Sequence, residues 1–514
     1  MKRRKKRGVK EKKEEKEKKV DKKKKEEKEK VIESYNVKAD EVSAEVKIVE
    51  NPEGRFYKLK SFTVSEATAV LMENVKQKLI AEESIALGST DPLAIKKAKE
   101  RVISKAKKIF EKEFGMKEKE ASLLATILCH EMLGFGNIEF LLSDPELEEV
   151  VIPNSKENVR VYHRRYGWLT TNLRIDKDET IENYASMIAR RVGRQITLLN
   201  PMLDAHLLTG DRVNAVLSPI ATKGSTITIR KFAREPWTVV DLIKNNTCSA
   251  EVFALIWTAI QYELNILFSG GTASGKTTML NVCASFIPPY HRVISIEDTR
   301  ELQLPEFLFW TPLVVRLPNP EGKGGVSMLD LLVNSLRMRP DRIILGEMRR
   351  QQEAEVLFEA MHTGHSVYAT VHADTAAETI ARLTNPPINV PANLLNAIDL
   401  CIVMFRDRRR NIRRVYQVAE FIREKTMEGV RANLIYRWNP SNDKVEKHSP
   451  SKKFFDELAR RTVLTRDEIN KEIKFKEKIL NYLVRKNIRK LSDVGKIVHL
   501  YYTNPQAIKK LIKS

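Results

Sequence analysis

The chain contains little cysteine, and this scarcity excludes two common ways of stabilising a fold. Four cysteines occur in 514 residues, and they lie far apart, at Cys129, Cys248, Cys283 and Cys401. No two of them form the Cys-x-x-Cys pair that is typical of zinc sites and many redox sites. We therefore expect no zinc, no disulfide framework and a reduced interior.

Long apolar runs are also missing. No stretch of about 18 apolar residues occurs, so we expect no membrane-spanning helix. The most apolar window, residues 252–268, is interrupted by Gln261, Glu263 and Asn265. The basic start of the chain leads into further charged residues instead of an apolar segment, which argues against a signal peptide. Together these absences predict a cytoplasmic protein.

Charge is abundant but unevenly distributed. Of the net charge of +22, the first 30 residues supply 10 positive charges, because they hold 18 Lys or Arg and 8 Asp or Glu. This composition predicts a charged, disordered tail over residues 1–34. Lys and Glu side chains four residues apart also allow transient helix there. The rest of the chain carries only the other 12 positive charges (22 minus 10).

The rest of the chain predicts an α/β protein with two domains. We expect an N-terminal domain over residues 35–236, helical to about residue 133 and α/β thereafter, and a linker over residues 237–250. In a C-terminal domain over residues 251–514, short buried strands alternate with helices, and the end of the chain is mainly helical. Its strands are expected at residues 264–268, 293–296, 342–345, 366–371 and 401–405.

One segment of the second domain carries a complete phosphate-binding pattern. Gly270 is followed after four residues by Gly275-Lys276-Thr277, between a predicted buried strand and a predicted helix. The glycines let backbone N–H groups surround phosphates, Lys276 is expected to reach the β- and γ-phosphates, and Thr277 is expected to bind Mg²⁺. The alternative is a Gly-rich turn without a ligand. The residues predicted to bind ATP are Gly270, Gly271, Thr272, Ala273, Ser274, Gly275, Lys276, Thr277 and Thr278.

Acidic residues follow two of the predicted strands. Glu347 is the first candidate for the carboxylate that orients or activates water, although Gly346 stands where an Asp usually precedes it. Glu297 and Glu301 are the alternatives for this role, and Asp298 is a predicted Mg²⁺ ligand beside Thr277, because the ends of parallel strands open onto one crevice. Without a phosphate site, Glu347 is a solvated strand end and Asp298 a helix cap.

Three further residues are candidates for the same site. His372 ends a predicted strand at the same edge of the sheet as Glu347, although a lone histidine is more often structural. Arg212 and Arg230 lie on strands of the N-terminal domain, which has no phosphate loop of its own. They suggest closure of that domain over bound nucleotide, and the alternative is a pair of surface arginines.

Taken in order, these motifs resemble those of the ATPases of type II and type IV secretion systems, a family that includes type IV pilus motors and the archaellum motor. The resemblance covers about residues 120–440. Residues 270–278 resemble the Walker A motif, 296–302 the aspartate box, 339–349 the Walker B motif and 363–373 the histidine box. In this family a Gly precedes the Walker B Glu. Asp204, residues 210–214 and residues 229–232 match motifs of the family's N-terminal domain. Residues 383–387 and the charged tail resemble archaeal members of the family more than the others.

The resemblance implies a RecA-like ATPase domain, a PAS-like N-terminal α/β domain with a helical extension, and a hexameric ring of identical chains. It implies ATP and Mg²⁺ between the domains, with Arg212 and Arg230 near the phosphates and His372 near the γ-phosphate. The expected role is a cytosolic motor, peripheral at the inner face of the cell membrane, that acts on a membrane platform protein in secretion or pilus assembly. The archaellum motor is the alternative within the family. A nucleic-acid translocase is less expected, because the basic charge lies in the tail and no groove with interleaved aromatic residues is evident. A non-catalytic nucleotide-binding module is the third alternative, since the usual Asp is missing.

Overall fold

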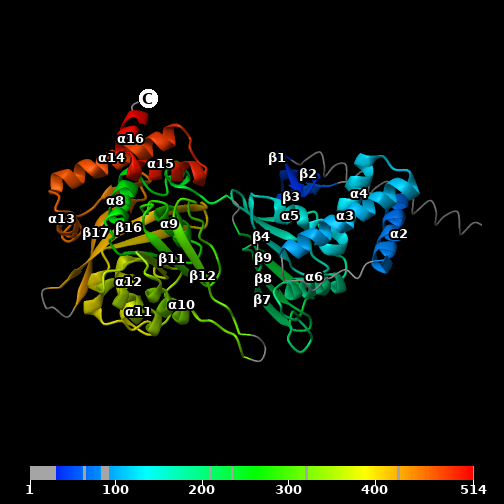
Figure 1. Ribbon diagram of the computed structural model, residues 1–514, viewed down its shortest axis with the longest axis horizontal. Coiled ribbons are helices and arrows are strands. Elements are labelled where there is room, and N and C mark those ends of the chain that lie inside the picture. Colours follow the sequence, from blue (N-terminus) through cyan, green and yellow to red (C-terminus); the bar gives the residue numbers. More distant parts are fainter. Residues whose placement is uncertain are drawn as a thin grey trace, which may run out of the picture. The chain divides into compact units, whose positions relative to one another are not determined.

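The computed structural model describes residues 30–61, 65–82, 92–207, 210–232, 235–318, 322–424 and 429–512 (Figure 1). The chain divides into two units, Met1–Ala233 and Arg234–Ser514. This division lies close to the predicted boundary after residue 236. The predicted tail lies almost entirely outside the described residues. Each unit is built on its own nine-stranded sheet, as expected for the α/β class.

The sheet of the first unit runs in the order β1-β2-β3-β6-β5-β4-β9-β8-β7. Its neighbouring strands are antiparallel except for β3 and β6, which are parallel. The strands are β1 (Lys30–Ala39), β2 (Val42–Asn51), β3 (Gly54–Lys60), β4 (Leu147–Ile152), β5 (Arg160–His163), β6 (Gly167–Thr171), β7 (Met202–His206), β8 (Arg212–Val216) and β9 (Thr226–Arg230). The helices are α2 (Glu66–Glu82), α3 (Pro92–Phe114), α4 (Glu118–Leu133), α5 (Ile138–Ser143) and α6 (Asp178–Arg191).

The prediction that this unit is helical up to residue 133 was wrong for residues 30–60, and the predicted tail extended too far by the first residues of β1. In β2 every second residue, starting from Val42, is buried up to Ile48. Many of the intervening residues are Lys and Glu, which favour helix. Their helix propensity outweighed the two-residue period of a strand in the prediction. For the described residues from α2 to α4 the prediction of helix is confirmed.

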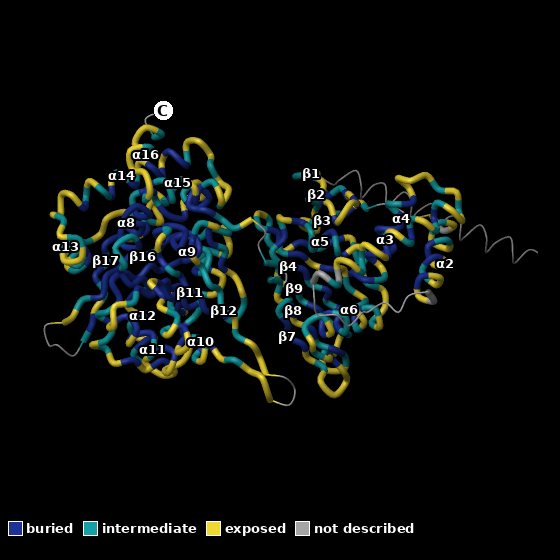
Figure 2. Tube along the Cα trace, viewed as in Figure 1, coloured by how far each residue is buried: buried dark blue, intermediate teal, exposed yellow. Residues whose placement is uncertain are grey.

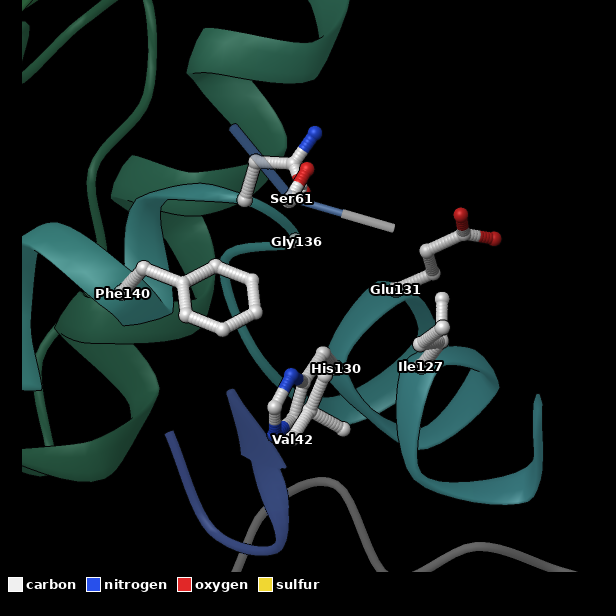
Figure 3. Close-up of a pocket in the computed structure, with 8 residues that line it drawn as sticks. Val42, Ser61, Ile127, His130, Glu131, Gly136 and Phe140 are labelled. Carbon is white, nitrogen blue, oxygen red and sulfur yellow. Dashed lines mark hydrogen bonds between the residues drawn. The ribbon is translucent and has the colours of Figure 1, made fainter. Parts of the chain in front are cut away.

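A small pocket lies where α4 and α5 meet β2, and Figure 3 shows its lining. His130 of α4 is buried there, and its Nε2 lies 2.7 Å from Oδ2 of Asp40, in the turn between β1 and β2. Tyr35 and Tyr57 each donate a hydrogen bond of 2.8 Å to Oδ2 of the buried Asp144. These contacts join the first three strands to the rest of the unit.

The sheet of the second unit runs in the order β12-β11-β13-β14-β10-β15-β16-β17-β18. The first six strands are parallel and the remaining pairings are antiparallel. The strands are β10 (Ile266–Gly270), β11 (Arg292–Glu297), β12 (Phe309–Val314), β13 (Arg342–Leu345), β14 (Ser366–Val371), β15 (Leu400–Asp407), β16 (Ile412–Arg423), β17 (Val430–Asn439) and β18 (Lys444–Lys447). All five strands predicted for this domain are confirmed.

Helices cover both faces of this sheet (Figure 1). They are α7 (Val239–Lys244), α8 (Ala250–Gln261), α9 (Lys276–Ala284), α10 (Met328–Ser335), α11 (Gln351–His362), α12 (Ala376–Thr384), α13 (Phe454–Thr462), α14 (Arg466–Arg485), α15 (Leu491–Thr503) and α16 (Pro505–Leu511), with 3₁₀ turns at Leu336–Met338 and Ala392–Ala397. Ile266 and Phe268 of β10 belong to one core and Leu267 to the other. β10, β13 and β14 are buried along their whole length, and the centre of this unit is dark blue in Figure 2.

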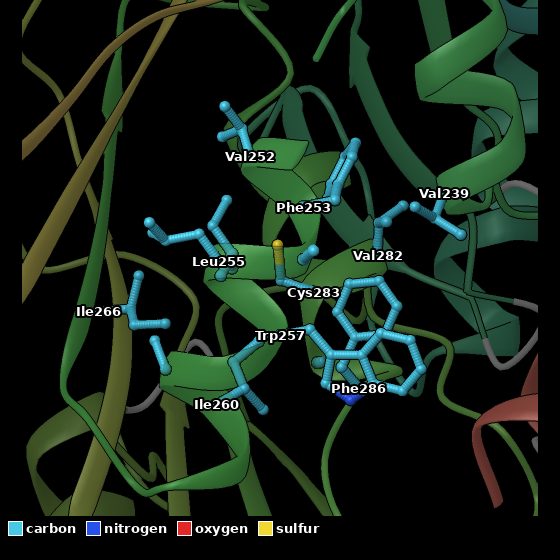
Figure 4. Packing of buried hydrophobic residues seen from close by; sticks show 14 of the residues in the cluster. Val239, Val252, Phe253, Leu255, Trp257, Ile260, Ile266, Val282, Cys283 and Phe286 are labelled. Atoms are coloured by element: carbon cyan, nitrogen blue, oxygen red, sulfur yellow. The ribbon is translucent and has the colours of Figure 1, made fainter. Parts of the chain in front are cut away.

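One core lies between the sheet and α8, α9 and α14. Trp257 stacks on Phe286 with ring centroids 4.9 Å apart, and both are fully buried (Figure 4). Val239 and Val240 of α7 are buried in the same core. The prediction of a linker over residues 237–250 was therefore wrong, because these apolar side chains anchor the segment to the second unit. No helix in the described part of the chain has the length and apolar character needed to cross a membrane.

Candidate nucleotide-binding site

The predicted phosphate loop connects β10 to α9 at the carboxyl end of the parallel strands. Gly270 has a φ of 147° and Gly275 a φ of 96°, which are conformations that favour glycine. A Cβ at Gly270 would lie 2.5 Å from the carbonyl oxygen of Met404, so no larger residue fits. Because α9 begins at Lys276, the N–H groups of its first turn have no partner within the helix and suit an anion.

Lys276 is buried in this loop with 7% of its surface exposed. Its Nζ donates hydrogen bonds of 2.9 Å to the carbonyl oxygens of Gly270 and Gly271, and it lies 3.2 Å from Nδ1 of His372. Burial lowers the pKa of Lys276, and the charge of Glu347 opposes this shift. The ammonium therefore lies against the backbone of the loop that is predicted to bind phosphate.

Glu347 lies just after β13, and its carboxylate contacts His372 and Arg349. Its Oε1 lies 3.1 Å from Nε2 of His372, and its Oε2 accepts a hydrogen bond of 2.6 Å from Nη2 of Arg349. Arg349 also pairs with Asp298, with Nη1 2.6 Å from Oδ2. The structure thus brings together Lys276, His372, Glu347 and Asp298, which the sequence separates by up to 96 positions.

Glu297 lies at the end of β11 and is 2% exposed. Its Oε1 accepts backbone hydrogen bonds from Glu301 and Leu302 at 2.9 and 3.0 Å, while its Oε2 is buried without a partner. Burial raises the pKa of this carboxyl to about 7. A carboxyl that titrates near neutral pH is well suited to accept a proton. The side chain of Glu301 is exposed, and its charge acts on Lys276.

Gly346 stands where many phosphate-loop proteins have an Asp, and its backbone packs against the end of β11. Its N–H donates a hydrogen bond of 2.8 Å to the carbonyl oxygen of Ile296. A Cβ here would lie 3.4 Å from that oxygen and 3.4 Å from Cα of Glu297. The carbonyl oxygen of Gly346 accepts a hydrogen bond from Thr370. A longer side chain would therefore meet β11 and Glu297.

The possible magnesium ligands fit a site in which phosphate oxygens complete the coordination, rather than a site built from protein side chains alone. Thr277 lies in the first turn of α9, and Asp298 is engaged by Arg349. Among the residues that the structure describes, no group of three or more His, Cys, Asp or Glu side chains is arranged to hold a metal. Magnesium at Thr277 would therefore depend on phosphate oxygens, which is typical of nucleotide sites.

Arg212 and Arg230 lie directly opposite each other on β8 and β9 of the first unit. Arg212 forms two hydrogen bonds with Asp204, from Nε to Oδ1 at 3.1 Å and from Nη2 to Oδ2 at 2.8 Å. Arg230 lies opposite Glu149 on its other side. Like charges at opposite positions of a sheet are unfavourable unless other groups compensate them. The structure therefore places both predicted arginines in one cluster within the first unit.

Two residues beside the site were missed by the predictions. Arg349 bridges Glu347 and Asp298, and Arg413 donates a hydrogen bond of 3.1 Å from Nε to the carbonyl oxygen of Ala273 in the phosphate loop. Arg413 follows a dense arginine run that begins directly after a predicted strand. Because that strand ends at the edge of the sheet that carries the loop, the run indicates arginines near the loop but not which of them contacts it.

Comparison with known proteins agrees with these motifs. The model of the family described as "Type II/IV secretion system protein" matches residues 134–430. This match covers more than half of the chain, so the chain belongs to the type II/IV secretion system protein family. The resemblance stated from the sequence is confirmed.

The relatives include archaeal and bacterial proteins. The uncharacterized protein MJ0900 of Methanocaldococcus jannaschii is 34% identical over 383 residues, which are 73% of this chain and 69% of that protein. The type IV secretion system protein PtlH of Bordetella pertussis is 33% identical over 245 residues, 43% of this chain and 72% of that protein. The crystal structure of the VirB11 ATPase from Brucella suis is similar at 24% identity and a TM-score of 0.28, covering 54% of this chain and 90% of that one.

Proposed function

We propose that this chain is an ATPase motor that binds Mg²⁺–ATP in the loop of residues 270–278 and hydrolyses it. The observation that carries the proposal is the series of contacts from Lys276 through His372 to Glu347 at the carboxyl edge of a parallel sheet. A strand order with β10 between β14 and β15 supports a RecA-like core for the second unit. Family membership supports a hydrolytic rather than a merely nucleotide-binding role.

In the proposed mechanism, each side chain of the site has a separate role in phosphoryl transfer. Lys276 would bind the β- and γ-phosphates, and Thr277 together with phosphate oxygens would hold Mg²⁺, which would supply positive charge to the reacting phosphates. Glu347 orients the attacking water, and Glu297 is the alternative proton acceptor because its pKa lies near 7. His372 exchanges its contact with Lys276 for one with the γ-phosphate.

Domain closure would couple this chemistry to movement. We propose that Arg212 and Arg230 of the first unit, a PAS-like domain, approach the phosphates when nucleotide binds and withdraw after hydrolysis. In a ring of six identical chains, this motion would act on a membrane platform protein of a secretion or pilus system. The chain would then work at the cytoplasmic face of the membrane through that partner.

The test is hydrolysis of ATP by the purified full-length chain, measured with and without Mg²⁺ and with Lys276→Ala as the inactive reference. We expect Mg²⁺-dependent turnover that the variant lacks, and a mass in solution of six chains. Absence of turnover in the hexamer with Mg²⁺ would overturn the proposal in favour of a non-catalytic module. Stimulation of turnover by DNA or RNA would instead favour a nucleic-acid translocase.

A further inference from the structure

The phosphate loop contains a residue in an unfavourable backbone conformation. Ala273 has a φ of 58°, in the left-handed region that residues with a Cβ seldom adopt. Within the loop, the N–H of Ser274 bonds to the carbonyl oxygen of Gly271 at 3.3 Å. Strained residues of this kind persist only where surrounding contacts hold them. The conformation of Ala273 therefore needs support from outside the loop.

Arg413 of β16 supplies such a contact. Its Nε donates to the carbonyl oxygen of Ala273 at 3.1 Å, and its Cδ lies 3.4 Å from the position that a Cβ on Gly275 would take. The side chain thus lies beside the loop, bonded to the carbonyl of Ala273 and next to the space above Gly275. In the part of the chain that the structure describes, its guanidinium has no acidic partner.

The neighbouring residues fix the position of Arg413. Arg414 is buried and pairs with Asp443 through two hydrogen bonds of 2.6 Å, and it also donates to the carbonyl oxygen of Asn245. The N–H of Val415 donates to the carbonyl oxygen of Thr247 at 2.7 Å. Because these bonds hold the two residues that follow Arg413, its Nε is presented to the loop from an anchored part of β16.

We propose that Arg413 is a positioning residue for the phosphate loop, and that it acts through the carbonyl of Ala273. By holding Ala273 in the left-handed region, it keeps the loop open toward phosphate before nucleotide arrives. A preorganised loop binds phosphate more tightly because less ordering accompanies binding. This inference rests on the proposed function, since it requires that the loop binds nucleotide.

The first test compares Arg413→Met with Arg408→Met in the full-length chain. Arg408 is exposed in the turn before β16 and serves as a matched control that removes the same charge from the same hairpin. We expect Arg413→Met to weaken ADP binding, measured by calorimetry, by roughly 3- to 10-fold, the effect of losing one hydrogen bond. KM for ATP should rise by a similar factor while kcat changes less than about twofold and the unfolding midpoint stays constant.

A second variant separates loop positioning from a direct contact with phosphate. Glycine adopts the left-handed region without strain, so Ala273→Gly removes the need for support. We expect Arg413→Met to weaken ADP binding less in the Ala273→Gly background than in the wild type. Equal losses in the two backgrounds would overturn the proposal, and so would unchanged ADP affinity in Arg413→Met. Loss of ADP binding in Lys276→Ala would show in either case that the loop binds nucleotide, which is the part of the proposed function on which this inference depends.

Discussion

Nδ1 of His372 lies 3.2 Å from Nζ of Lys276. An ammonium group can only donate, so this imidazole nitrogen accepts, and the ring is neutral with its proton on Nε2. Burial lowers the pKa of His372, and the charge of Lys276 lowers it further, which agrees with a neutral ring. The Nε2 proton faces Glu347, 3.1 Å away. Without nucleotide, His372 therefore accepts a hydrogen bond from the ammonium group that would bind the phosphates of ATP.

We predict that Lys276→Ala removes productive nucleotide binding. The substitution takes away the ammonium that lies within hydrogen-bond distance of two loop carbonyls, where phosphate charge would be stabilised. Removing one preorganised donor at such a site lowers turnover by roughly 10²- to 10³-fold. Steady-state ATP hydrolysis measures the effect, with Lys471→Ala on the exposed face of α14 as control. Turnover near the wild-type rate in Lys276→Ala would contradict the assignment of the loop.

We predict that Glu347→Gln binds ATP but hydrolyses it far more slowly. Loss of a positioned general base typically reduces the rate by about 10²- to 10⁴-fold. Glu297→Gln is the decisive comparison, because Glu297 also ends a strand at this edge and has a buried oxygen without a partner. Measuring ATP binding and turnover for both variants separates the roles. If Glu297→Gln loses turnover while Glu347→Gln keeps most of it, Glu297 is the base.

The class of fold was predictable because the strands of the second unit are short apolar runs between helices. β16, β17 and β18 were not anticipated, since charged residues such as Arg413 and Arg437 interrupt their apolar residues. β1 to β3 were mistaken for helix and tail for a related reason. Their Lys and Glu residues favour helix locally, and only tertiary packing shows that alternate residues are buried.

The candidate site was predictable where a motif fixes the spacing of its residues. The phosphate loop is such a case, because its glycine conformations follow from a local pattern. The contacts of Arg349 with Asp298 and of Arg413 with Ala273 were not predictable. They depend on the direction of long side chains from distant strands, which neither spacing nor composition determines.

The stability of the second unit should depend on pH through Glu297. Its pKa is raised from an ordinary value of 4.5 to about 7 by burial, so the folded state holds this proton more tightly than the unfolded state. The free energy of unfolding therefore falls as pH rises from about 4.5 to 7, by up to roughly 3 kcal/mol. Glu297→Gln cannot ionise and should lose none of this stability.

Urea unfolding of the wild type and Glu297→Gln at pH 5, 6, 7 and 8 measures this difference. We expect the variant to gain stability relative to the wild type as pH rises, with the gain complete above about pH 7. Glu359→Gln, an exposed residue of α11, controls for the general effect of removing a carboxylate. A difference that is constant over this range would show that Glu297 titrates normally.

Arg230→Ala should separate an effect on catalysis from an effect on stability. Arg230 lies directly opposite Arg212, and like charges in such a pair are unfavourable by roughly 0.2–1 kcal/mol. Its removal should therefore change the free energy of unfolding by less than about 1 kcal/mol. If the arginine stabilises the transferring phosphoryl group, turnover should nevertheless fall by about 10³-fold or more. Hydrolysis assays on protein whose mass in solution equals that of the wild type, with Arg174→Ala as an exposed control in the same unit, measure this loss. Because Arg212 remains beside the vacated position, the double variant Arg212→Ala/Arg230→Ala should be slower still while its mass in solution stays that of the wild type. Wild-type turnover in the double variant would show that both arginines are surface residues and that closure of the first unit does not complete the site.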